Sequence, residues 1–318
     1  MQRPISTALT TGAILLAILI IGGCSGHRNT RPNTHINALP PILYVQTWNC
    51  GNNNDNVTAT LKSDGTLVVS GMGAMQDYDG LQLFAPWRGI TDYITGVIID
   101  NGVTAIGNGA FGDLTGLTSV TISGSVNSIG NFAFAGSASV TIPGSVISIG
   151  TGALSRTAAI NVATDNPHYS SEDGVLFNKT KTVLIQYPQN KQNASYAIPN
   201  SVTLIGADAF ANCKNLTNVT FGNSVTAIEA FSFAFCYNLE SVTISNSVTK
   251  IGSGAFAHSG LTTVTSLNPI PPEVTGTNPF FDINENACLY VPANSIEAYR
   301  LAEHWKDFKC IKPISVSE

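Results

Sequence analysis

Residues 205–256 read IGADAFANCKNLTNVTFGNSVTA, IEAFSFAFCYNLESVTISNSVTK and IGSGAF, and the three segments begin at Ile205, Ile228 and Ile251. Apolar residues recur at the same offsets after each isoleucine, and the interval between segments is 23 residues. In the two complete segments they are Phe210, Leu216, Val219, Phe221 and Val225, then Phe233, Leu239, Val242, Ile244 and Val248. A fixed set of offsets at a fixed interval indicates an internal structural repeat.

The same pattern extends toward the N-terminus. Ile-Gly-x-x-Ala-Phe also begins at Ile106 and Ile129, and a weaker copy begins at Ile149, where Leu154 replaces the phenylalanine. The interval is 23 residues from Ile106 to Ile129 and 20 residues from Ile129 to Ile149. One such unit is too short to bury its own apolar side chains, whereas stacked units bury them together. The sequence therefore predicts a mainly β solenoid of 20–23-residue repeats over residues 97–268.

The Leu-x-x-Val-x-Ile part of each repeat is the expected strand. Its Val and Ile point inward, because side chains alternate between the two faces of a strand. The outward positions carry Ser119 and Thr121, Asn218 and Thr220, and Ser241 and Thr243. We expect this uncharged polar face, together with Tyr169, to form the candidate partner-binding surface. Gly107 and its equivalents are expected to adopt backbone angles that other residues avoid.

The N-terminus has the features of an export signal. Arg3 precedes the apolar run Ala13 to Ile21, which is nine residues long and too short to span a bilayer. Ile21-Gly22-Gly23-Cys24 then resembles a lipobox, in which the cysteine thiol takes a lipid. The prediction is a signal peptide over 1–23, lipidation of Cys24, a tether over 24–40, and membrane contact through this anchor alone. An ordinary secretory signal with an unrelated cysteine is the alternative.

Three groups of segments outside the repeats add a family resemblance. They are Asp64–Met75 with Ala85-Pro86-Trp87, then Asn166–Tyr169, Asp173–Phe177 and Leu184–Pro188, and finally Leu289–Pro292 with Tyr299, Trp305 and Phe308. With the repeats, they resemble the BspA-like leucine-rich-repeat surface lipoproteins of Bacteroidetes type. The resemblance implies an N-terminal β cap over 41–96, a β-hairpin inserted at about 163–196 and a C-terminal α/β cap over 269–318. It also implies a surface-attached binding protein, because some members are adhesins toward host matrix proteins or other bacteria.

Local patterns point to the same elements without the family. The run from Val57 to Leu61 and the run from Leu67 to Ser70 flank Asp64-Gly65, which is typical of a hairpin. A second hairpin is expected from 175–177 and 183–187, and a short helix is expected after Asn294-Ser295.

The cysteines have different expected roles. Cys213 and Cys236 are 23 residues apart and so occupy equivalent positions, whose side chains point the same way. This favours a ladder of buried thiols over a disulfide. Cys288 and Cys310 form a possible disulfide in the C-terminal cap, and Cys50 has no evident partner. The spacing Cys-x-x-Cys is absent, which disfavours redox and zinc sites.

Candidate chemistry is sparse. The sequence contains no His-Glu-x-x-His, nucleophile elbow or P-loop, so no catalytic, cofactor-binding or metal-binding residues are predicted. Asp77, Asp79 and Asp92 could form a carboxylate pair of a glycan-acting enzyme, but solvated loop charges are the favoured interpretation. The stretch 52–56 could hold calcium, although a turn is favoured. The net charge of -5 argues against nucleic acid as a partner.

Aromatic residues in the caps and the insertion offer another kind of site. Trp87, Tyr93, Tyr169, Tyr187 and Tyr290 lie outside the repeat ladder and are expected to be exposed. For Trp87, as for Trp305, closure of a small cap core is the favoured role. Tyr169 is the one retained as a possible binding residue.

The function predicted from these observations is a non-catalytic cell-envelope lipoprotein that binds a protein or glycan partner on host matrix or bacterial surfaces. The outer membrane is the expected location, facing either the cell surface or the periplasm. No Asp or Glu lies between Cys24 and Asp55, whereas exported surface lipoproteins of Bacteroidetes often carry acidic residues there. A periplasm-facing structural component is therefore the alternative, and a glycan-acting enzyme is a third, less favoured reading.

Overall fold

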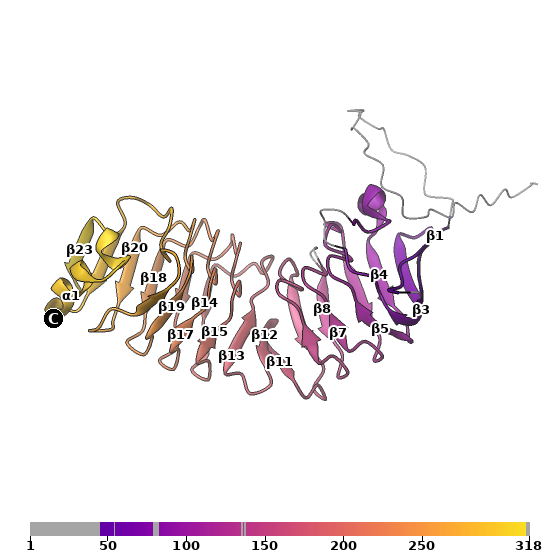
Figure 1. Ribbon diagram of the computed structural model, residues 1–318, viewed down its shortest axis with the longest axis horizontal. Coiled ribbons are helices and arrows are strands. Elements are labelled where there is room, and N and C mark those ends of the chain that lie inside the picture. Colours follow the sequence, from indigo (N-terminus) through magenta and orange to yellow (C-terminus); the bar gives the residue numbers. More distant parts are fainter. Residues whose placement is uncertain (1–44, 54, 79–82, 135, 137, 316–318) are drawn as a thin grey trace, which may run out of the picture.

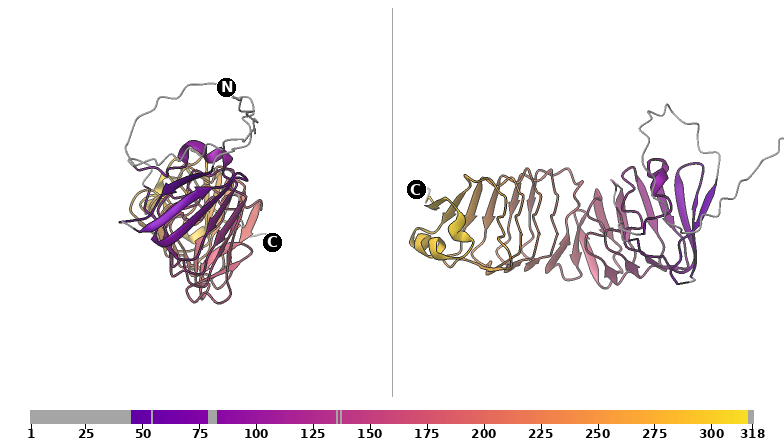
Figure 2. Two further views of the ribbon diagram at one scale, coloured as in Figure 1. Left: turned by 90° about the vertical axis from the view of Figure 1, so that its right-hand side faces the viewer. Right: turned by 45° about the horizontal axis from the view of Figure 1, so that its top comes forward.

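A computed structural model describes residues 45–53, 55–78, 83–134, 136 and 138–315. The predicted signal peptide, Cys24 and the whole of the predicted tether lie outside the described residues. The chain forms an elongated right-to-left stack of coils in Figure 1, with β1 and the C-terminal helix at opposite ends. Seen end-on, the coils overlie one another (Figure 2). The predicted mainly β, leucine-rich-repeat solenoid is confirmed.

The first half of the solenoid contains residues 45–162. Its N-terminal end is the antiparallel set β1 (Gln46–Asn49), β2 (Asn56–Leu61) and β3 (Thr66–Ala74), which contains the hairpin predicted around Asp64-Gly65. The first part of β3 pairs with β4 (Gly96–Ile99), and its last residues pair with β5 (Val103–Ile106). This long strand therefore starts both faces of the solenoid. The face that starts with β4 continues with β6 (Ser119–Ile122), β8 (Ser139–Ile142) and β10 (Ala159–Val162). The face that starts with β5 continues with β7 (Ser128–Ile129) and β9 (Ser148–Ile149).

The second half contains residues 169–313 and two sheets, of seven and six strands. One runs β11 (Tyr169–Glu172), β12 (Val175–Asn178), β13 (Val183–Gln186), β15 (Leu204–Ile205), β17 (Ala227–Ile228), β19 (Lys250–Gly252) and β21 (Glu273–Thr275). The other runs β14 (Ser195–Ala197), β16 (Asn218–Thr220), β18 (Ser241–Ile244), β20 (Thr263–Ser266), β22 (Cys288–Val291) and β23 (Cys310–Pro313). The β12–β13 hairpin matches the predicted insertion, and β11 adds a third antiparallel strand that the sequence did not predict.

Helical structure is confined to short segments. They are η1 (Arg88–Tyr93), η2 (Ala293–Ser295), α1 (Ile296–Leu301) and η3 (Trp305–Asp307). The predicted C-terminal helix is present, although the Ser295 side chain makes no capping hydrogen bond. Within the described ranges, none of these helices is long and apolar enough to cross a membrane.

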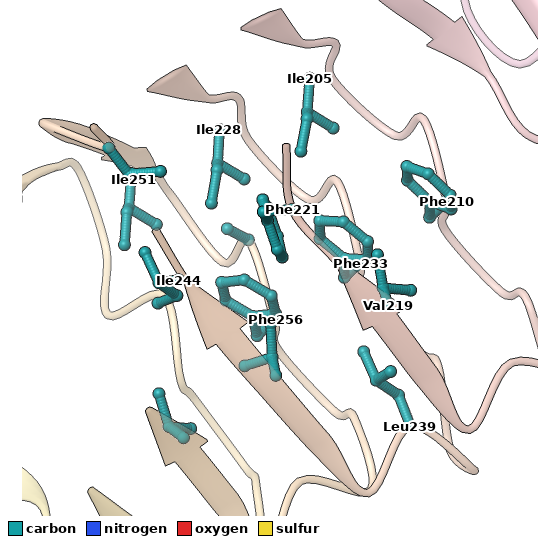
Figure 3. Packing of buried hydrophobic residues seen from close by; sticks show 14 of the residues in the cluster. Ile205, Phe210, Val219, Phe221, Ile228, Phe233, Leu239, Ile244, Ile251 and Phe256 are labelled. Carbon is teal, nitrogen blue, oxygen red and sulfur yellow. The ribbon is translucent and has the colours of Figure 1, made fainter. Parts of the chain in front are cut away.

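The repeat phenylalanines stack in file, as the spacing predicts. Phe233 lies between Phe210 and Phe256, with ring centroids 4.6 Å and 5.2 Å away (Figure 3). Tyr187 extends this file beyond Phe210, at 5.1 Å. Tyr187 is only 1% exposed, so the expectation that it is a surface aromatic outside the ladder is wrong. Its side chain occupies the ring position of the turn that precedes Phe210.

The interior is divided into two clusters, so the stacked units do not bury their apolar side chains in one continuous core. Phe111 stacks on Trp87 and Phe134 stacks on Phe111 in a first cluster, whereas Phe210, Phe233 and Phe256 belong to a second. The inserted strand β12 forms the boundary, because successive side chains point to opposite faces of a strand. Leu176 packs into the first cluster, and its neighbours Val175 and Phe177 pack into the second.

The repeated glycines have a different role from the one expected. Gly107, Gly130 and their equivalents do not have positive φ. A Cβ at Gly107 would lie 1.9 Å from the carbonyl oxygen of Gln76, and one at Gly130 would lie 2.5 Å from the backbone nitrogen of Asn108. Glycine is therefore required here because adjacent coils approach closely, and not because of its own backbone angles.

The cysteines are arranged as the sequence favoured. Cys213 and Cys236 are buried free thiols, and the Cys236 Sγ–H donates to the carbonyl oxygen of Phe210 at 3.0 Å. Cys50 is also buried and free. A disulfide joins Cys288 to Cys310 across the adjacent strands β22 and β23.

Candidate partner-binding surfaces

The outer face of the β14–β23 sheet presents two columns of side chains along the solenoid. Strand register aligns Ser195, Asn218, Ser241, Thr263, Cys288 and Cys310 in one column, and Ala197, Thr220, Thr243, Thr265, Tyr290 and Lys312 in the other. Except for Lys312, these side chains are uncharged. Four predicted face residues, Asn218, Thr220, Ser241 and Thr243, are therefore direct neighbours on paired strands.

Ser119 and Thr121 lie on a separate surface. They are exposed on β6 of the first half, where β6 pairs with β4 and lies beside β8. The strands of the insertion separate this surface from the β14–β23 sheet (Figure 1). The structure thus divides the predicted face into a first-half part and a second-half part.

Tyr169 lies on neither part. It belongs to β11, which pairs with β12 at one edge of the sheet that runs from β11 to β21. The ring is half-buried against the first core cluster, and its hydroxyl donates to the carbonyl oxygen of Ile147 at 3.4 Å. Burial raises the pKa of the Tyr169 phenol above its ordinary value. The residue therefore closes the junction between the insertion and the first half.

Both tryptophans favoured as cap residues are buried. The Trp87 indole N–H donates to the carbonyl oxygen of Ala110 at 3.0 Å, and that of Trp305 donates to the carbonyl oxygen of Pro272 at 3.0 Å. Each indole therefore has its polar group satisfied while its rings cover the end of a core cluster. Tyr93 is 40% exposed, and Tyr290 is half-buried within the outer column.

Two of the carboxylates considered for catalysis or for calcium binding accept backbone hydrogen bonds. Asp77 Oδ1 accepts the backbone N–H of Asn108 at 2.8 Å, and Asp55 Oδ2 accepts that of Ala74 at 2.8 Å. Asp92 is exposed on η1, and Asp79 lies outside the described residues. No group of three or more His, Cys, Asp or Glu side chains suited to a metal ion occurs within the described part of the chain.

A groove of about 500 Å³ crosses three consecutive coils of the first half. It is open on one side and is lined by the coil corners at 108–113, 131–134 and 152–156, with residues 83–85 forming a wall. Phe132 projects there with 61% of its surface exposed. On the rim, the Arg88 guanidinium lies 3.7 Å from the centroid of Phe84 and pairs with Asp113 at 3.6 Å.

Comparison with known families and structures identifies the repeat. The model for the BspA type leucine rich repeat region matches six copies, over residues 90–196 and 189–280. The chain belongs to the BspA type leucine rich repeat family.

Two solved structures have a similar fold. A leucine-rich repeat protein from Eubacterium ventriosum is 25% identical, with a TM-score of 0.51 and 84% of each chain covered. The pneumococcal vaccine antigen PcpA is 18% identical, with a TM-score of 0.50, covering 84% of this chain and 98% of its own. No curated protein matches the chain.

A row of three rings at the surface of this BspA-type solenoid was not predicted from the sequence, and in it Phe235 and Phe281 are exposed and His258 is half-buried. Phe235 stacks on His258 at 4.8 Å, and His258 meets the edge of Phe281 at 5.5 Å. The His258 Nδ1 is 2.8 Å from Asp282 Oδ2. The 23-residue interval between Phe235 and His258 is the signal that could have revealed it, because positions at the repeat interval lie on adjacent coils.

Proposed function

We propose that this chain is a non-catalytic, lipid-anchored binding module of the bacterial outer membrane. Its partner is a protein or glycan of a host matrix or bacterial surface, and it binds through the outer face of the β14–β23 sheet. The observation that carries the proposal is the pair of columns across six hydrogen-bonded strands, whose side chains are uncharged except for Lys312 at one end. The BspA-type repeat supports an interaction role, and the family supplies no catalytic residues.

The chemistry of this face supports recognition through many small polar contacts. Ser, Thr and Asn side chains both donate and accept hydrogen bonds. A partner can cover them without removing water from charged groups, which is costly. Several copies anchored on one membrane would also add avidity without new contacts.

Charged, bulky side chains in the columns test the binding surface. The double variant Thr220→Arg/Thr243→Arg places two guanidinium groups on adjacent strands of the face. We expect binding to immobilised fibronectin, laminin, fibrinogen, collagen or bacterial cells to fall at least about tenfold, as for a buried interface contact of ~1.4 kcal/mol. Thr121→Arg is the matched control, because it lies on a strand of the same type in the first half. An equal loss in the control, or no binding by the unaltered chain to any probe, would overturn this part of the proposal.

The anchor and its orientation need a separate experiment. Cys24→Ser should abolish incorporation of radioactive palmitate and release the chain from membranes. Proteolysis of intact cells should degrade the unaltered chain if it faces outward. Survival of the chain would instead support the periplasm-facing structural component.

A further inference from the structure

The groove of the first half lies at equivalent corners of successive coils. Counted from the repeat isoleucines at 106, 129 and 149, its residues fall at offsets of two to seven: Asn108, Gly109, Gly112, Asp113, Asn131, Phe132, Phe134, Gly152, Ser155 and Arg156. It therefore shares no residue with the outer sheet face.

Glycines line the groove at two of its corners. Gly109 and Gly152 have φ of 61° and 62°, the left-handed region in which glycine is favoured. The Phe132 ring lies over Gly152, because a Cβ there would be 2.5 Å from its Cε1 atom. A side chain at position 152 would therefore displace the ring.

The amide oxygens of the groove bind the backbone of the next coil, whereas the amide nitrogens have no such role. Asn108 Oδ1 accepts the backbone N–H of Asn131 at 2.6 Å, and Asn131 Oδ1 accepts that of Thr151 at 2.8 Å. Neither amide nitrogen donates a hydrogen bond within the described part of the chain, so each can donate to a ligand. The second half builds the same corner with Ala207 and Ala230 at the equivalent positions, so the corner forms without side-chain amides.

Arg156 adds an unpaired positive charge. Among the described arginines, Arg88 pairs with Asp113 and Arg300 pairs with Glu297, while the exposed Arg156 has no ion-pair partner in the described part of the chain. A planar guanidinium favours two parallel hydrogen bonds to a carboxylate.

We propose that this groove binds an oligosaccharide containing a uronic acid. The negative face of the exposed Phe132 ring attracts the weakly positive C–H groups of a pyranose. The free amide nitrogens of Asn108 and Asn131 donate to hydroxyl oxygens, and Arg156 pairs with the uronate carboxylate. A volume of about 500 Å³ lies within the range of small-ligand sites, ~300–1,000 Å³. This site is additional to the proposed sheet-face function.

The test is calorimetric titration of the full chain, purified in detergent, with three probes. Tetragalacturonate represents plant-wall uronate, a hyaluronan tetrasaccharide represents animal-matrix uronate, and chitotetraose is the neutral control. We expect at least one uronate probe to bind, and chitotetraose to bind at least about tenfold more weakly. Phe132→Ala and Arg156→Gln should each weaken uronate binding about tenfold, and added salt should weaken it in the unaltered chain.

Phe231→Ala is the matched control. Phe231 is also exposed, also has a positive φ, and also covers a glycine of the next coil, Gly254, but it lies outside the groove. Its substitution should leave uronate binding unchanged.

Three results would overturn the inference. The first is no heat of binding from either uronate probe, measured with a chain that melts like the native protein. The second is binding of chitotetraose as tight as that of the uronate probes, and the third is a loss of uronate binding in Phe231→Ala as large as in Phe132→Ala. The Thr220→Arg/Thr243→Arg variant should retain uronate binding. Its result separates failure of the groove from failure of the sheet face.

Discussion

Phe233 has an aromatic ring of a neighbouring coil against each of its faces. It is fully buried, and the planes of Phe210 and Phe256 are tilted from its own by only 12° and 6°. The ring therefore contributes both apolar burial and stacking energy, and its removal would leave a cavity with rigid walls.

We expect Phe233→Ala to lower the free energy of unfolding by ~3–5 kcal/mol, the usual cost of a phenylalanine-sized cavity. Phe231→Ala, two residues away and 45% exposed, should change it by less than ~1 kcal/mol. Denaturant titration followed by circular dichroism measures both values. Similar losses in the two variants would contradict the stacked arrangement.

The buried thiol of Cys50 gives the stability of the first half a pH dependence. Burial raises the pKa of this thiol from 9.0 to about 12. A raised pKa means that the folded state holds the proton more tightly than the unfolded state does. The thiol therefore stabilises the fold fully below pH 9.0, and this contribution is lost as the pH rises toward about 12.

Between about pH 8 and about pH 10, the unaltered chain should lose ~1 kcal/mol more unfolding free energy than Cys50→Ala, which has no thiol to ionise. The constant cost of the smaller side chain cancels in this difference. Denaturant titrations at the two pH values provide the measurement. Equal losses would show that the Cys50 thiol ionises in the folded state as readily as in the unfolded state.

At the scale of the elements, adjacent coils are held so close that a methyl group cannot be inserted at certain corners. Gly130 follows β7, and its missing side chain allows contact with the backbone of residues 107 and 108. Gly124, in the turn after β6, has open space where its Cβ would be. The two glycines therefore differ in packing, although neither has a positive φ.

Gly130→Ala should destabilise the chain by ~1–3 kcal/mol, because the backbone of the neighbouring coil must move. Gly124→Ala should be neutral or slightly stabilising, since alanine restricts the unfolded chain by up to ~1 kcal/mol. Thermal melts of both variants provide the comparison. A neutral Gly130→Ala would mean that the coils tolerate wider spacing.

The whole molecule has two core clusters joined at the insertion. Each coil contacts its neighbours, so a local loss of packing is expected to spread along its own half of the stack. The β12 strand contacts both clusters through Leu176 on one face and Val175 and Phe177 on the other.

Phe111→Ala should therefore increase amide hydrogen exchange mainly in residues 57–160, while β14 to β20 remain protected. Phe233→Ala should have the reverse effect. Exchange followed by mass spectrometry in mild denaturant resolves the two halves. Uniform loss of protection from either variant would show that the insertion couples the clusters into a single unit.

Periodicity in the sequence determined the repeat, its inward-facing ladder and the buried thiols, and local turn patterns determined both hairpins. These features depend on interactions between neighbouring residues or between positions one repeat apart, so equal spacing and local sequence are sufficient to predict them. The same reasoning placed Asn218, Thr220, Ser241 and Thr243 together.

Only the tertiary structure decided the break in the core, the separation of Ser119 and Thr121 from the second-half face, and the placement of Tyr169 and Tyr187. The path of an inserted segment depends on which core cluster the side chains on each face of its strands can fill. The repeat interval carries no information about this packing. The groove also needed coordinates, because it arises where glycines of separate coils leave space beside Phe132 and Arg156. Spacing predicts which residues stack, but the shape of a surface depends on how side chains of different size fill the space between coils.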